Sequence, residues 1–167
     1  KALLTAEFDH LLDALAATPL ALRHSPAAVE VMDDFILSHT RDNAALDQMR
    51  RAIVERDGSA LLCIELYADH ASELPPRLEA LARDLAASGY PCRTRALTDP
   101  APQARVWSLR EAALGLSMAM KGDGKAVSFV EDTAVAPERL RDYIERGGYE
   151  ALKTVLAPWT YLASVVY

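Results

Sequence analysis

The feature that most constrains the fold of this chain is the apolar run at 60–67, ALLCIELY, which follows the turn signal Asp57-Gly58. A strand with one face in water alternates apolar and polar residues, whereas a continuous apolar run of this length is typical of a strand covered on both faces. We therefore expect residues 60–67 to form a central strand of a sheet.

The segment after this run has the clearest helical pattern in the chain. Pro75 and Pro76 are compatible with a helix only near its first turn, and Gly89 is placed to end it. Leucines recur at the spacing i, i+4, i+7 and i+11 and define one apolar face: Leu74, Leu78, Leu81 and Leu85.

The first part of the chain predicts a strand, a helix and a second strand. Residues 1–7 suit a short strand, and Asp9 is placed to cap a helix that ends at Pro19. Residues 20–23 are ambiguous. The alternation AVEVM at 28–32 favours a half-buried strand.

Three further segments complete the pattern. Asp33 or Asp34 can open a short helix that continues through Leu37. The polar stretch 41–58 suits a solvated helix or a loop, and the mixed residues 92–97 suit a short strand at a sheet edge.

The resulting order is strand-helix-strand, a helical insertion, and a second strand-helix-strand. It favours an α+β domain of the ferredoxin-like type, an antiparallel sheet with helices on one face. A long helix from Asp99-Pro100, a strand at 126–130 and a final helix from Pro137 are additions. We expect one domain at 1–147 and an apolar tail at 148–167 that packs on the domain or on a partner, including a second copy of the chain.

The composition excludes some function classes. The net charge is −6 and the Lys and Arg residues build no stripe, which argues against nucleic-acid binding. No apolar run approaches the roughly 20 residues of a membrane span, and no signal peptide is visible. We therefore expect a cytoplasmic protein.

Metal and disulfide chemistry also has little support. Cys63 and Cys92 belong to no CxxC pair, so we expect reduced thiols, with a disulfide left open if their strands are neighbours. The histidines show no metal-ligand spacing and suit surface or capping roles: His10, His24, His39 and His70. No metal site is predicted.

The stretch 104–137 contains the best candidates for a site. Trp107 and Arg110 lie one helical turn apart, so the guanidinium can stack on the indole and keep its donor fork fixed. A fixed fork is what bidentate binding of a carboxylate requires. The alternative is that Arg110 pairs with Glu111, Asp132 or another local acid.

The remaining charges of this stretch carry no catalytic motif. The segment KGDGK at 121–125 lacks the GxxxxGK[ST] frame of a phosphate-binding loop and suits a surface turn. Glu131 and Asp132 are consecutive, so on a strand they face opposite ways and cannot act as a pair. We assign no catalytic residue within this chain.

Two segments resemble a known family. RVWSLREAALGL at 105–116 and SFVEDTAVAPERL at 128–140 are similar to the FAD-linked oxidases of the glycolate oxidase and D-lactate dehydrogenase type. The likeness extends over about 1–144 and is to the C-terminal, substrate-side domain of the larger members.

The resemblance implies a cap-like domain that closes over FAD and receives a small 2-hydroxy acid of the glycolate or D-lactate type. The FAD would be bound mainly by sequence outside this chain, on a flavin-binding domain of the same polypeptide, and an iron–sulfur cluster elsewhere in that polypeptide stays open. Arg110 would bind the substrate carboxylate, with Trp107 beside it. This chain alone is not expected to be active.

Two positions depart from the family pattern. Val130 stands where some relatives have a lysine, and Leu114 stands where they have a threonine. Both departures argue against substrates like D-2-hydroxyglutarate. The alternative function is a non-catalytic ferredoxin-like interaction module that binds a partner through its sheet or its apolar tail.

Overall fold

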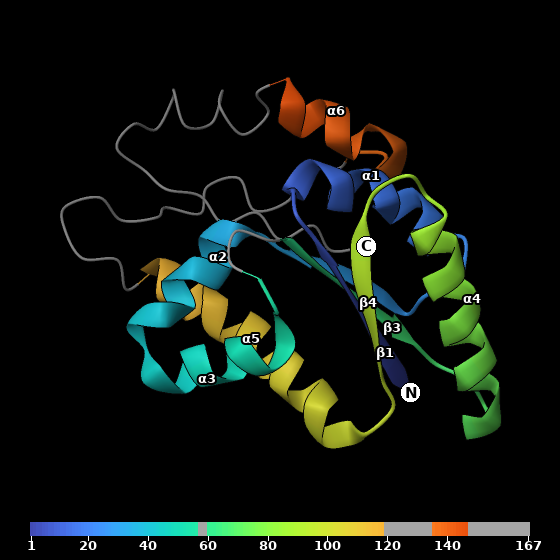
Figure 1. The fold of residues 1–167 in the computed structure, drawn as a ribbon, viewed down its shortest axis with the longest axis horizontal. Coiled ribbons are helices and arrows are strands. Elements are labelled where there is room, and N and C mark those ends of the chain that lie inside the picture. Colours follow the sequence, from blue (N-terminus) through green and yellow to red (C-terminus); the bar gives the residue numbers. More distant parts are fainter. Residues whose placement is uncertain (57–59, 119–134, 147–167) are drawn as a thin grey trace.

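The computed structural model describes residues 1–56, 60–118 and 135–146, with the side chains of 113–118 excepted (Figure 1). Several predictions fall outside these residues: the strand at 126–130, the turn at 121–125, the pair Glu131-Asp132 and the apolar tail. They stay predictions.

The elements follow one another in the predicted order. Short 3-10 turns precede α3, α4 and α6. The bounds are β1 (Ala2–Phe8), α1 (Leu11–Leu22), β2 (Ala28–Met32), α2 (Asp34–His39), α3 (Ala44–Ile53), β3 (Ala60–Leu66), α4 (Leu74–Ala86), β4 (Cys92–Leu97), α5 (Pro100–Met118) and α6 (Leu140–Glu145).

The four strands form one antiparallel sheet in the order β2-β3-β1-β4. Strand β3 therefore lies between β1 and β2, which run in the same direction and are joined by α1. This split β-α-β arrangement, repeated by β3, α4 and β4, is that of the ferredoxin-like fold. The predicted α+β class is confirmed, and all seven residues of β3 are buried, as a central strand requires.

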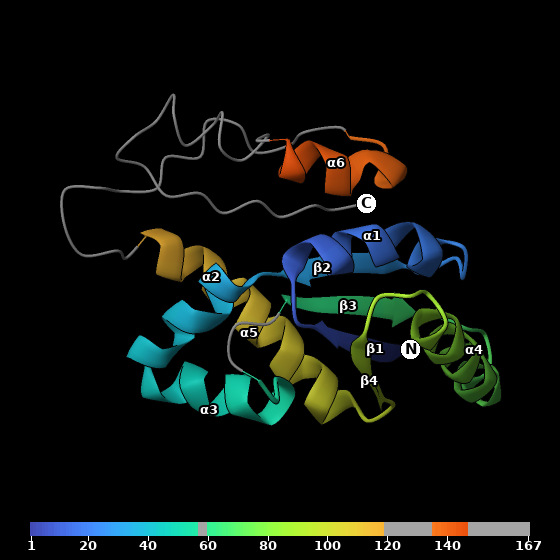
Figure 2. The same cartoon turned by 45° about the horizontal axis from the view of Figure 1, so that its top comes forward.

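Helices α1 and α4 pack on one face of the sheet, as the ferredoxin-like prediction expects. The added helix α5 covers the other face together with α2 and α3, and Figure 2 shows the sheet between these two layers. Each face has its own core. The α1–α4 core includes Leu4, Phe8, Leu62, Ile64, Leu78, Leu81 and Leu85, and the α5 core includes Leu3, Met32, Leu61, Cys63, Leu97, Val106 and Leu109.

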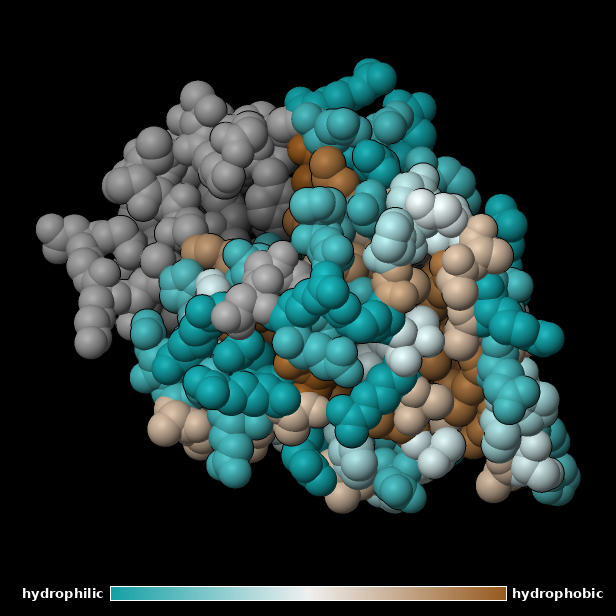
Figure 3. All heavy atoms as spheres, in the orientation of Figure 1, coloured by the Kyte–Doolittle hydropathy of each residue, from teal (hydrophilic) through white to brown (hydrophobic). Residues whose placement is uncertain are grey.

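Consecutive residues of a strand enter different cores. In β1, Leu3 packs under α5 whereas Leu4 packs under α1 and α4. The reason is the two-residue period of a strand, which sends alternate side chains to opposite faces. Among the described residues, Tyr67 is the only large hydrophobic side chain that is exposed, and hydrophilic side chains dominate the face drawn in Figure 3.

Helix α4 confirms its sequence prediction. Its four leucines are all buried, Pro75 and Pro76 lie in its first turn, and Gly89 follows it with a positive φ of 82°. A positive φ carries little steric cost for glycine, which explains why the chain can turn there.

Helix α1 differs from its prediction at both ends. It continues through Pro19 to Leu22, because proline removes only one backbone hydrogen bond while Thr18 and Ala21 stay buried against the sheet. Asp9 does not cap the helix. Its carboxylate instead pairs with Arg56 at 3.2 Å, and no side chain caps the helix at His10.

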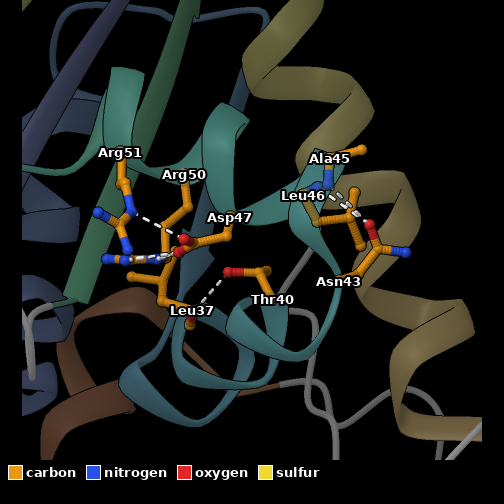
Figure 4. Close-up of polar contacts among 8 residues, drawn as sticks. All are labelled: Leu37, Thr40, Asn43, Ala45, Leu46, Asp47, Arg50 and Arg51. Atoms are coloured by element: carbon orange, nitrogen blue, oxygen red, sulfur yellow. Dashed lines mark hydrogen bonds and ion pairs between the residues drawn. The ribbon is translucent and has the colours of Figure 1, made fainter.

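The insertion between β2 and β3 is held by local polar contacts (Figure 4). Asn43 Oδ1 accepts hydrogen bonds from the backbone N–H groups of Ala45 and Leu46, which caps α3. Asp47 accepts from Arg50 and Arg51 at 2.8 and 2.7 Å, and the hydrogen bond from Arg50 lowers the pKa of Asp47. These contacts stabilise α3, which packs against α5.

The start of α2 confirms a prediction. The Asp33 side chain accepts a hydrogen bond from the Ile36 backbone N–H at 2.9 Å and caps the helix. Burial raises the pKa of this carboxyl, while the backbone hydrogen bond opposes that rise.

Candidate functional site

Helix α5 is fixed on the sheet by one buried stripe. Val106 and Leu109 are fully buried in the α5 core. Near the start of the helix, Gln103 Nε2 donates to the Leu97 and Thr98 carbonyl oxygens at 3.0 and 3.1 Å. This anchoring determines which residues of α5 lie next to the sheet, and Trp107 and Arg110 are among them.

Arg110 forms an ion pair with Glu30 of β2. Its Nε donates to Glu30 Oε2 at 2.5 Å, and the two side chains are 33% and 14% exposed. The described partner of Arg110 is therefore an acid 80 residues earlier in the chain, not a neighbour in sequence. Its terminal nitrogens, Nη1 and Nη2, have no partner among the described residues.

Trp107 contacts a different carboxylate. Its indole Nε1 donates to Glu65 Oε2 of β3 at 3.2 Å, and the same oxygen accepts from Lys1 Nζ at 2.7 Å. The hydrogen bond to Glu65 raises the pKa of Lys1. The spacing of Trp107 and Arg110 allows the guanidinium to stack on the indole, but this contact is not among those of the described residues. Each side chain instead contacts a different acid on the sheet.

Glu30 and Glu65 lie close together on the sheet face under α5. Glu30 is opposite Cys63, and Glu65 is opposite Ala28 two residues along, so the two acids are diagonal neighbours on adjacent strands. Both are largely buried. A carboxylate in this position needs a cationic partner, and Arg110 and Lys1 provide one each.

Sequence reasoning missed both acids. The signal was present: Glu30 interrupts the valines of AVEVM, and Glu65 interrupts the apolar run ALLCIELY. An acid inside a strand that is covered on both faces has to meet a donor from the covering helix.

A small pocket is lined by residues of β1, α3, β4 and α5, and none of Glu30, Glu65, Trp107 and Arg110 is among them. Its volume is about 90 Å³, and Thr5, Arg95, Pro102 and Arg105 are among its lining residues. Cofactor pockets are typically about 300–1,000 Å³, so this pocket does not fit a flavin ring. We assign no FAD contact to it.

The described part of the chain shows neither a candidate metal site nor a candidate membrane span. There, no group of three or more His, Cys, Asp or Glu residues is placed to bind a metal ion. Within the same residues, none of the helices combines the length and the apolar character that a membrane crossing needs.

The two cysteines are free thiols, as predicted, because β1 separates their strands. Burial raises the pKa of both thiols, far more for the fully buried Cys63 than for the half-buried Cys92.

The thiolate is the reactive form of a cysteine, so we expect iodoacetamide at neutral pH to label Cys92 slowly and Cys63 only after unfolding. Peptide mass spectrometry with and without guanidinium chloride checks this, and rapid labelling of native Cys63 would contradict it.

Comparison with known proteins identifies the family. The profile described as "FAD linked oxidases, C-terminal domain" matches residues 1–155. The chain belongs to this family. The family resemblance inferred from the motifs at 105–116 and 128–140 is thereby confirmed.

Curated relatives share one name, D-2-hydroxyglutarate dehydrogenase. The protein from Pantoea ananatis is 29% identical over 146 residues, covering 83% of this chain and 14% of the relative. Those from Pseudomonas putida and Escherichia coli are 26% and 28% identical, each covering 85% of this chain and 15% of the relative. The chain thus spans about one seventh of the length of these relatives.

Proposed function

We propose that this chain is the substrate-side domain of an FAD-dependent oxidoreductase that oxidises a 2-hydroxy acid. Its membership of the FAD-linked oxidase C-terminal family carries the proposal. The names of the relatives support a 2-hydroxy acid as the class of substrate.

Arg110 is proposed to bind the substrate carboxylate. Its Nε is engaged by Glu30, whereas its Nη1 and Nη2 have no partner among the described residues. The outer edge of a guanidinium, formed by these two nitrogens, can accept a carboxylate in a bidentate arrangement. Trp107, held by Glu65, would line the same side of α5 and limit the space beside the carboxylate.

FAD supplies the two-electron acceptor for oxidation of the carbon that bears the hydroxyl group. The residues of this chain would orient that carbon by fixing the carboxylate next to it. Binding through Arg110 therefore serves the reaction by position, because a reactant held in place reacts without the entropic cost of an encounter.

Within the class we favour a small acid of the glycolate or D-lactate type. Arg110 offers one cation for one carboxylate, and the apolar residues Val130 and Leu114 stand where some family members have a lysine and a threonine. The names of the relatives point instead to D-2-hydroxyglutarate, so a direct comparison of substrates decides the question.

The test uses the purified full-length polypeptide with its FAD. We expect reduction of an electron-accepting dye with 2-hydroxy acids, with a higher kcat/KM for glycolate or D-lactate than for D-2-hydroxyglutarate. A preference for D-2-hydroxyglutarate would overturn the small-acid proposal and keep the class. A full-length protein that lacks bound flavin, or that oxidises none of the three acids, would overturn the proposed function.

A further inference from the structure

The geometry of the contact between Glu30 and Arg110 suits a role in orienting the guanidinium as well as in stabilising the fold. Glu30 projects from β2 toward α5 and reaches the Nε atom of Arg110, the donor nearest the aliphatic chain. An arginine side chain has several rotatable bonds, and an anion bound at Nε fixes the plane of the guanidinium. The two outer nitrogens are then left in a defined direction.

Because Glu30 is largely buried, its carboxylate needs a cationic partner. Glu30 is 14% exposed, lies opposite Cys63 in the sheet and has the acid Glu65 as a diagonal neighbour on the adjacent strand. A carboxylate here loses hydration, and Arg110 is its described cationic partner. The pair is therefore expected to stay formed with or without a ligand on the outer edge of Arg110.

We infer that Glu30 is a positioning residue that orients Arg110 for the substrate carboxylate. This inference rests on the proposed function, because it concerns the same guanidinium. Glu30 itself would not touch the substrate. Its carboxylate would hold Nε from the sheet side while Nη1 and Nη2 bind the ligand from the other side.

The arrangement is repeated one strand away. Glu65 of β3 accepts a hydrogen bond from Trp107 Nε1, one turn before Arg110 on α5. Two acids on adjacent strands thus bind two side chains that lie one turn apart on the same helix. The repetition favours a role in fixing side-chain orientation over a single chance contact.

The experiment compares Glu30→Gln with the unchanged full-length flavoprotein. The substituted glutamine side chain keeps the size and one oxygen acceptor but removes the charge that fixes Nε. We expect the KM for the preferred 2-hydroxy acid to rise about 10-fold, kcat to change less than about 3-fold, and flavin content to stay the same. Product inhibition by the corresponding 2-oxo acid should weaken in parallel, because the product carries the same carboxylate.

A matched control is Asp13→Asn. Asp13 pairs with Arg141 at 3.3 Å on the opposite side of the sheet, and these side chains are 23% and 35% exposed, similar to the Glu30–Arg110 pair. Loss of an ion pair alone should leave KM unchanged. A rise in KM in Asp13→Asn equal to that in Glu30→Gln would overturn the inference.

A double-mutant cycle separates orientation from a merely structural role. If Glu30 acts through Arg110, the variant Glu30→Gln with Arg110→Lys should have the same KM as Arg110→Lys alone. Additive effects would overturn the inference. Should Glu30→Gln fail to fold, Glu30→Asp decides, since it keeps the charge but withdraws it by one methylene, and an unchanged KM would then refute the positioning role.

The outcomes also separate this inference from the proposed function. A higher KM in Arg110→Ala with an unchanged KM in Glu30→Gln removes Glu30 and keeps the substrate-binding role of Arg110. Unchanged kinetics in Arg110→Ala removes the proposed role of Arg110 and the inference with it.

Discussion

Replacing Arg110 with alanine in the full-length flavoprotein is expected to lower kcat/KM for the 2-hydroxy acid by roughly 10²- to 10³-fold, with FAD retained. Removing one partner of a charged, hydrogen-bonded contact typically costs about 2–5 kcal/mol, and each 1.4 kcal/mol is about tenfold. The loss includes the carboxylate contact and the freedom that the substrate regains. Steady-state kinetics measures kcat/KM, and the flavin absorbance per protein measures the retention of FAD.

The kcat/KM of Arg110→Lys should lie between that of the unchanged protein and that of Arg110→Ala. Lysine keeps the positive charge but lacks the planar fork that can bind Glu30 and a substrate carboxylate at once. Arg105→Ala is the matched control, because Arg105 is an exposed arginine of the same helix with no partner among the described residues. A kcat/KM in Arg110→Ala equal to that of Arg105→Ala would exclude Arg110 from the site.

The second large effect is expected from Leu109→Ala, which should lower the free energy of unfolding by about 2–5 kcal/mol. Leu109 is fully buried in the α5 core, between Ser108 and Arg110. Truncation removes apolar contacts and leaves a cavity between α5 and the sheet. Urea denaturation followed by circular dichroism measures the change.

Ser108→Ala provides the comparison for this variant. Ser108 is exposed on the same helix, and alanine has the better helix propensity, so stability should change by less than about 0.5 kcal/mol. Equal stability of the two variants would mean that α5 is not held on the sheet by its buried stripe.

Local patterns predicted most of the elements. The leucines of α4 define its buried face without help from the rest of the chain, and the apolar run of β3 defines its central place. The prediction failed at Pro19, where local preference for ending a helix is outweighed by packing of the following turn on the sheet. Asp9 failed for a similar reason, since Arg56 competes for its carboxylate.

The candidate site was predicted only in part. Trp107 and Arg110 were found from their spacing on one helix, which is a local property. Their partners, Glu65 and Glu30, could not be paired with them from sequence, because those contacts join β3 and β2 to α5 across 42 and 80 residues. Only the strand order and the placement of α5 over that face of the sheet determine which acid meets which donor.

The division of the domain into two cores has a consequence for how such a domain diverges. Effects of substitutions add when the sites share no neighbours, and residues on opposite faces of the sheet meet this condition. Substitutions around Arg110 affect the packing of the α5 core, while the α1–α4 core on the other face of the sheet keeps its own packing. If Arg110 binds the substrate as proposed, selection can alter that side of the domain while the other side preserves the margin of stability that folding requires.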